Sequence, residues 1–143
     1  MSTYLVVMDK AVPAQSLRYG LVKFISEHKP AEFVLLQTPE RLPGESEEEA
    51  RRAARESAAA ARVQLSAMGL PVAEALVGDP LPRKAIAAEI SGGRRTYDGI
   101  MLASKAPGLL RLLHFDLAHQ LERKFHVPVE YVDQTVAEAA PVA

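Results

Sequence analysis

The feature that most constrains the fold is a regular alternation between short apolar runs and longer segments with helical periodicity. The short runs are apolar at nearly every position rather than at every second one, which indicates strands buried on both faces of a sheet. Single helical segments separate these runs, so consecutive strands are expected to be parallel with right-handed crossovers. The predicted strands cover residues 4–8, 33–36, 72–77, 97–103 and 127–132.

Helix-end signals mark the segments between these runs. The strongest prediction is a helix from about Ser46 to Met68, because Ser46 and Glu49 have capping-box spacing and Gly69 provides a stop. Its apolar stripe consists mostly of alanine, and small side chains allow a helix axis to lie close to a sheet. The other helices are predicted to begin at Pro13, at Pro80 and near Asp116, with Asp116 as the N-cap of the last helix.

This order of elements predicts a three-layer, doubly wound α/β fold. Its open sheet has five parallel strands in the order 3-2-1-4-5, as in Rossmann-like proteins. A chain of 143 residues has the length of one domain, which we place at residues 1–132. The alanine-rich tail at 133–143 has little pattern, and we expect it to be frayed.

The predicted strand order also locates a candidate binding site. Open parallel sheets bind ligands at the carboxyl ends of their strands, at the point where the winding reverses. Here that crevice lies between the first and fourth strands. Asp9 has two readings that the sequence leaves open, as a ligand contact or as a turn residue that hydrogen-bonds its own loop. The candidate ligand-binding residues are Asp9, Ala103, Ser104, Lys105, Gly108 and Asp116.

Composition argues against several classes of protein. The chain has no cysteine, so disulfides, thiolate nucleophiles and cysteine-based metal sites are excluded. With 17 basic and 18 acidic residues, it has no basic excess for binding nucleic acid. No apolar run approaches the ~20 residues of a membrane helix. No basic segment precedes the first strand, so we expect no signal peptide and a cytoplasmic protein.

Residue spacing predicts neither catalysis nor a metal centre. No nucleophile–histidine–aspartate pattern and no pair of carboxylates on one element stands out, so we expect no enzyme and no cofactor. His114, Asp116 and His119 are close in sequence. However, the spacing between the two histidines does not place them on one helix face, which argues against a metal site.

Four short motifs stand in a characteristic order on the predicted elements. They are Val6-Val7-Met8-Asp9 at the end of the first strand, Gly78-Asp79-Pro80 before a helix, Asp98 to Ser104 on the fourth strand, and Pro128-Val129 at the start of the last strand. With these motifs the chain resembles the universal stress protein family over about residues 3–132. The resemblance implies a Rossmann-like fold of the adenine-nucleotide alpha-hydrolase type.

The chain departs from the ATP-binding members of that family. Those members carry Gly-x-x-Gly, nine residues, and then Gly followed by Ser or Thr, which lets backbone N–H groups and a hydroxyl contact phosphates. In this chain the two spaced glycines are replaced by Ala103 and Ala106, and the final pair is replaced by Asp116-Leu117. The resemblance is therefore to members without the usual ATP-binding motif. Lys105 and Gly108 are the only compensating features that the sequence offers.

The resemblance implies a non-catalytic module that acts in stress response or regulation. Two alternatives stay open at this point. One is a nucleotide-binding member with a diverged phosphate loop, which would bind ATP or AMP and act as a weak ATPase. The other is a small-molecule carrier or sensor that uses the same crevice for an uncharged or cationic ligand, which Asp9 and Asp116 would tolerate.

The last predicted strand has only one neighbour in the order 3-2-1-4-5, and an edge strand can pair with another chain. Many members of the family dimerise through this edge, so the resemblance implies a homodimer. The expected interface residues are Val129, Tyr131 and Val132. Glu130 argues against this interface, because a charge on an edge strand is a common device against pairing.

Overall fold

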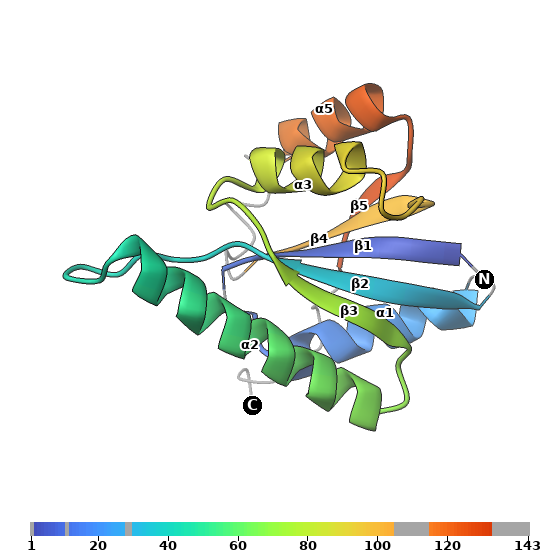
Figure 1. The fold of residues 1–143 in the computed structure, drawn as a ribbon. Helices are drawn as coiled ribbons and strands as arrows, with labels where there is room; N and C mark the ends of the chain where they lie inside the picture. Colours follow the sequence, from blue (N-terminus) through green and yellow to red (C-terminus); the bar gives the residue numbers. More distant parts are fainter. Residues whose placement is uncertain (1, 11, 28–29, 105–114, 133–143) are drawn as a thin grey trace, which may run out of the picture.

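The computed structural model describes residues 2–10, 12–27, 30–104 and 115–132. A parallel sheet forms the middle of three layers, and its strand order β3-β2-β1-β4-β5 confirms the predicted topology (Figure 1). Every described strand pair is parallel. The strands are β1 (Ser2–Asp9), β2 (Ala31–Gln37), β3 (Val72–Val77), β4 (Gly99–Ser104) and β5 (Val129–Tyr131).

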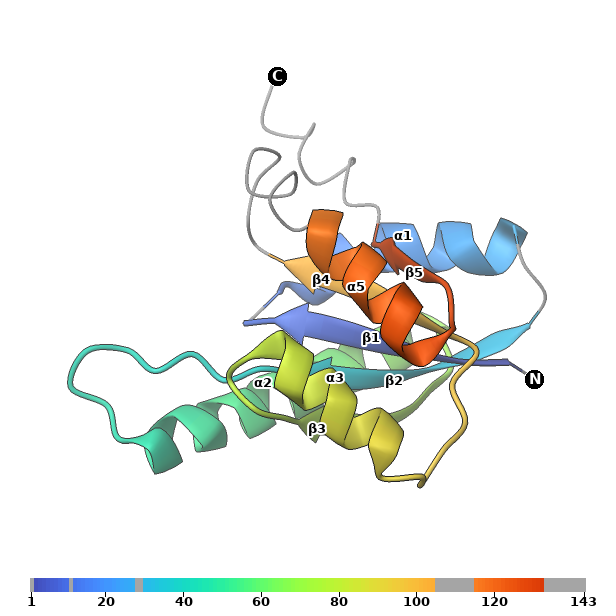
Figure 2. The ribbon, with the colours of Figure 1, turned by 90° about the horizontal axis from the view of Figure 1, so that it is seen from above.

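Helices cover both faces of the sheet (Figures 1 and 2). The first face carries α1 (Ala14–Glu27) and α2 (Glu47–Ala67), and the second carries α3 (Pro82–Ser91) and α5 (Phe115–Phe125). Alternate residues of β1 therefore enter two different cores. Val6 and Met8 pack with α1 and α2, whereas Leu5 and Val7 pack with α3 and α5. This two-sided burial explains why the strands are apolar at successive positions.

Helix α2 forms as its end signals predict. The Ser46 hydroxyl accepts a hydrogen bond from the Glu49 N–H at 3.1 Å, and the Glu49 carboxylate accepts one from the Ser46 N–H at 3.3 Å. Gly69 ends the helix with a φ of 88°. Because the helix buries alanines against the sheet, it approaches β2 and β3 closely. The buried stripe is Ala50, Ala54, Ala58, Ala61 and Leu65.

Two helix starts differ from the sequence prediction. Helix α3 begins at Pro82 rather than Pro80, because the Asp79 side chain accepts the Leu81 N–H at 2.9 Å and extends the preceding turn by two residues. Helix α5 begins at Phe115, which places the backbone of Asp116 inside the first turn instead of at the N-cap.

Side chains from α2 donate hydrogen bonds to one carbonyl group in the edge strand β3 and to another just after it. The pairing of β2 with β3 shifts register between Phe33 and Val34, so one residue of β3 bulges. Arg62 donates to the Ala73 carbonyl at this bulge at 3.1 Å, and Arg51 donates to the Gly78 carbonyl at 3.3 Å. A bulge and charged side chains are devices that protect a sheet edge from pairing with another chain.

The packing of α3 leaves no room for a side chain at Gly78. A Cβ at this position would lie 2.7 Å from the Ala85 Cβ and 3.3 Å from the Ala85 Cα. We expect Gly78→Ala to lower the free energy of unfolding by about 1–3 kcal/mol, because α3 must move to accept the methyl group. Chemical denaturation measures this loss.

A second variant tests the cause of that loss. Ala85→Gly removes the nearest atom, so the double variant should be less destabilised than the sum of the two single variants. Strict additivity would contradict a direct steric contact between Gly78 and Ala85.

Candidate functional site

Three residues form a hydrogen-bonded corner at the carboxyl ends of β1 and β2. The Thr38 hydroxyl donates to Asp9 Oδ1 at 3.0 Å and accepts the Lys10 N–H at 2.9 Å. The Thr38 N–H donates to the Met8 carbonyl at 3.0 Å. Asp9 is therefore bonded to the segment after β2.

Lys10 has an unusual backbone conformation at this corner. Its φ is 66°, in the left-handed region that side chains other than glycine and asparagine rarely adopt. The residue is exposed, whereas Thr38 is 0% exposed and Asp9 is half-buried. Sequence reasoning placed residues 9–12, and with them Lys10, in the predicted crevice, but it missed Thr38, because a contact between residues far apart in sequence leaves no local pattern.

The structure describes some of the residues that were predicted to line the crevice, and others lie outside the described part of the chain. Asp9 is in register with Ser104, so the ends of β1 and β4 meet as predicted. Ala103 is 1% exposed and packs in the core beneath α1 and α2. Lys105 and Gly108 lie outside the described residues. The same applies to the side chain of Asp116, of which only the backbone in α5 is described.

Leu117 is the residue that the resemblance aligns with the Ser or Thr of the family's ATP-binding members. It is half-buried and packs against the core between the sheet and the α3–α5 layer. Its side chain therefore contributes to packing.

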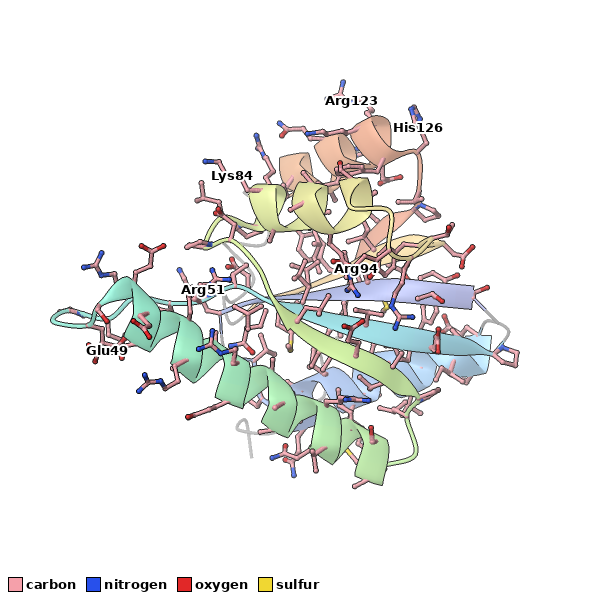
Figure 3. All side chains as sticks on the ribbon, in the orientation of Figure 1. Glu49, Arg51, Lys84, Arg94, Arg123 and His126 are labelled. Carbon is pink, nitrogen blue, oxygen red and sulfur yellow. The ribbon has the colours of Figure 1, made fainter. Side chains whose placement is uncertain are left out.

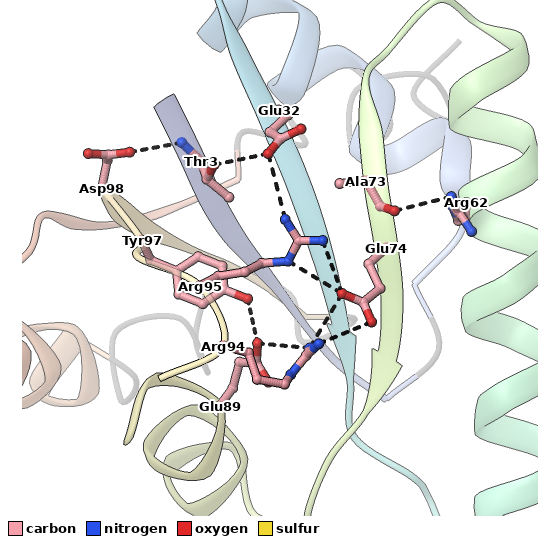
Figure 4. Close-up of polar contacts among 10 residues, drawn as sticks. All are labelled: Thr3, Glu32, Arg62, Ala73, Glu74, Glu89, Arg94, Arg95, Tyr97 and Asp98. Carbon is pink, nitrogen blue, oxygen red and sulfur yellow. Dashed lines mark hydrogen bonds and ion pairs between the residues drawn. The ribbon is translucent and has the colours of Figure 1, made fainter. Parts of the chain in front are cut away.

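An ionic cluster lies at the other end of the sheet, near the amino ends of the strands (Figure 4). Arg94 contacts Glu74 at 3.4 Å and Glu89 at 3.3 Å. Arg95 contacts Glu74 at 3.2 Å and Glu32 at 3.7 Å. The two arginines thus connect the loop after α3 to β2 and β3. Glu74 is the single charged residue on β3, and this is the sequence signal that the strand needs a charged partner at this position.

The cluster changes the proton affinity of its members. Burial raises the pKa of Glu74, but hydrogen bonds and charges from Arg94 and Arg95 outweigh it and hold that pKa below its ordinary value. Burial, followed by the hydrogen bond from the Tyr97 hydroxyl to Glu89 at 2.6 Å, raises the pKa of Tyr97. The charges of the arginines and glutamates are therefore largely paired with one another within the cluster, as is typical of ion pairs that stabilise a fold.

Part of β5, the strand predicted to form the dimer interface, is buried within its own protomer. Val129 is 9% exposed and Val132 is 0% exposed, and they pack in the cores on opposite faces of the sheet. Tyr131 is half-buried and Glu130 is exposed. An interface at this edge would therefore present Glu130 and Tyr131 rather than the two valines.

Several charged side chains lie on the outer surfaces of the helical layers. Lys84, Arg123 and His126 point away from the sheet on the α3–α5 layer, and Glu49 and Arg51 lie at the start of α2 (Figure 3). Within residues 2–10, 12–27, 30–104 and 115–132, no three histidine or carboxylate side chains are grouped to hold a metal ion. Among those same residues, no helix is long and apolar enough to cross a membrane.

Comparisons with known proteins support the fold. No protein-family model and no curated protein matches the sequence. A solved structure of a universal stress protein from Archaeoglobus fulgidus is similar, with a TM-score of 0.57 and 17% sequence identity. The match covers 93% of this chain and 94% of that chain. The chain therefore has the fold of a universal stress protein over nearly its whole length.

Removal of the Glu74 charge tests the ionic cluster. Ionised Glu74 stabilises the folded state above its ordinary pKa of 4.5, and this stabilisation is lost as the pH falls through the lower pKa of the folded state. At pH 7 we expect Glu74→Gln to lower the free energy of unfolding by about 1 kcal/mol, as partly exposed ion pairs do. The difference from the wild type should shrink on acidification below that ordinary value, measured by urea unfolding at several pH values.

Glu56→Gln provides the matched control, because Glu56 is exposed on α2 away from the cluster. It should change stability little at any pH. A Glu74→Gln deficit that stays constant down to pH 3 would contradict the electrostatic role of this carboxylate.

Proposed function

We propose that the chain is a non-catalytic module of the universal stress protein type, acting in stress response or regulation as a homodimer without tight ATP binding. The fold similarity and the sequence motifs support the type of module. The observation that carries the proposal is that Ala103 is buried in the core and Leu117 is half-buried against it, at the positions that the resemblance aligns with a glycine and a hydroxyl donor of ATP-binding members.

The packing of these two residues argues against the family's usual phosphate site. The Ala103 methyl group lies at a position where ATP-binding members present bare backbone to a phosphate. Leu117 offers no hydrogen bond, and its removal from the core would itself be unfavourable. Restoring a phosphate site therefore needs changes in the core as well as in the loop.

A small-molecule carrier or sensor is the second candidate function. The hydrogen-bonded corner of Asp9, Lys10 and Thr38 favours it, because this corner holds two charged residues at the end of the sheet where ligands of such folds bind. Catalysis is not needed for this role. The remaining alternative is a nucleotide-binding protein with a diverged phosphate loop that acts as a weak ATPase. The following experiment tests for nucleotide binding.

Thermal unfolding with Mg-ATP tests the first proposal. We expect no clear rise in melting temperature at 1 mM Mg-ATP. A dissociation constant of ~1 mM adds only about 0.4 kcal/mol of stability, whereas ~10 μM adds about 2.7 kcal/mol. A clear rise would show that a phosphate site exists by another route and would support the nucleotide-binding alternative.

The variant Asp116→Gly with Leu117→Ser serves as the positive comparison. It restores the last two residues of the family pattern, so its own melting temperature should rise with Mg-ATP relative to its ligand-free state. If the rise is absent, Ala103 and Ala106 are sufficient to block the site.

The dimer proposal is supported by the contrast between the two sheet edges. Arg51 and Arg62 and the bulge protect β3, whereas β5 forms the opposite end of the described sheet. Light scattering at micromolar concentration should give about twice 15.5 kDa. Glu130→Lys with Tyr131→Asp should shift the mass toward the monomer, because both side chains lie on this strand and are not fully buried.

Glu56→Lys on α2 is the control for the dimer experiment, because it changes a charge on an exposed helix far along the chain from β5. It should leave the mass unchanged. A wild-type monomer, or a dimer that survives the double change in β5, would exclude this interface.

A further inference from the structure

We propose that the corner formed by Asp9, Lys10 and Thr38 binds a small organic acid, with Lys10 contacting its anionic group and Asp9 accepting a hydrogen bond from its donor group. This inference rests on the proposed role as a small-molecule carrier or sensor and names the class of the ligand. It places the anion at the corner of β1 and β2. The glycine pattern of the family lies instead on the segment between β4 and α5.

The backbone of Lys10 supplies the first argument. A φ of 66° is unfavourable for a lysine and would suit a glycine. Within the described part of the chain, His126 is the only other non-glycine residue with a positive φ, and it directly follows α5, where helices commonly end in this conformation. Lys10 follows a strand, so a helix end does not explain it. Residues held in strained conformations are concentrated at ligand sites, where the side chain rather than the backbone is needed.

Thr38 supplies the second argument, because its hydroxyl bonds both the backbone of Lys10 and the side chain of Asp9. Its fully buried hydroxyl accepts the Lys10 N–H and donates to the Asp9 carboxylate. Its own N–H is bonded to the end of β1. Thr38 is thus a positioning residue that locks the strained backbone and orients the carboxylate without facing solvent itself.

The remaining bonding capacity of the corner defines the ligand. Among the described residues, the Lys10 ammonium has no ion pair, and the hydrogen bond of the Asp9 carboxylate uses Oδ1 only. An ammonium group binds carboxylates and phosphates, and a carboxylate accepts bonds from hydroxyl or ammonium groups. A ligand that uses both would be a hydroxy acid, an amino acid or a phosphomonoester with a free hydroxyl. The uncharged or cationic ligand that Asp9 suggests on its own is thereby replaced by one with an anionic group.

Backbone NMR of the ¹⁵N-labelled full-length protein tests the ligand class. Sodium glycolate, a hydroxy acid, and inorganic phosphate serve as probes at constant ionic strength, and sodium acetate serves as the carboxylate without a donor. We expect saturable shifts of the Lys10 and Thr38 amides at millimolar glycolate and phosphate. Glycolate should bind several-fold more tightly than acetate, because its hydroxyl donates to Asp9.

Substitutions of Lys10 separate its charge from its strain. Lys10→Met keeps the strain and removes the charge, so it should leave the melting temperature unchanged and weaken glycolate binding about tenfold. Lys10→Gly removes both, so it should raise the melting temperature by about 2–4 °C while also losing affinity. Lys84→Met, an exposed cation on α3, is the matched control and should change neither quantity.

Thr38 provides a test of positioning. Thr38→Ser keeps the hydroxyl and should retain glycolate binding, whereas Thr38→Val leaves Asp9 and the Lys10 N–H without their partner and should lose it. The proposal is overturned if the Lys10 and Thr38 amides do not shift with either anion, or if Lys10→Met binds glycolate like the wild type. It is also overturned if Lys10→Gly gains no stability. None of these results bears on the Mg-ATP or light-scattering outcomes, which test the proposed function separately.

Discussion

Burial of β1 on both faces is the constraint on which the rest of the structure depends. Leu5, Val6, Val7 and Met8 are all almost fully buried, and successive side chains enter opposite cores. β1 also pairs with β2 on one side and β4 on the other. A polar side chain in the middle of this strand would be unpaired and costly. Polar chemistry is therefore confined to the two ends of the strands, where the helical layers no longer cover the sheet.

The same two-sided burial explains how much of the fold could be predicted. A strand that is apolar at every position requires helices on both faces, and single helices between strands fix their parallel direction. Strand order and the ends of α2 followed from this pattern and from local capping. The start of α3 did not, because Pro80 is a good first helical residue, and only the bond from Leu81 to Asp79 shows that the turn continues to Pro82.

The candidate site was less predictable than the fold, because its residues are joined by contacts between distant segments. Asp9 is visible in the sequence as the polar end of an apolar strand. The importance of Thr38 and Lys10 depends on a hydrogen bond across 28 residues and on a positive φ, neither of which has a sequence signature. The same limit applies to β5, where the edge position was predictable but the burial of Val129 and Val132 depends on helices placed on both faces.

The two ends of the sheet use their charges differently. At the amino end, Arg94 and Arg95 neutralise glutamates from β2, β3 and α3, so the charges hold the loop before β4 in place. At the carboxyl end, Thr38 bonds the Asp9 side chain and the Lys10 backbone, and no ion pair joins the two charges among the described contacts. Charges that are matched stabilise the fold, whereas charges without a partner can pair with a ligand. This contrast supports the proposal that a ligand binds at the carboxyl end, because the charges at the amino end are already used to stabilise the fold.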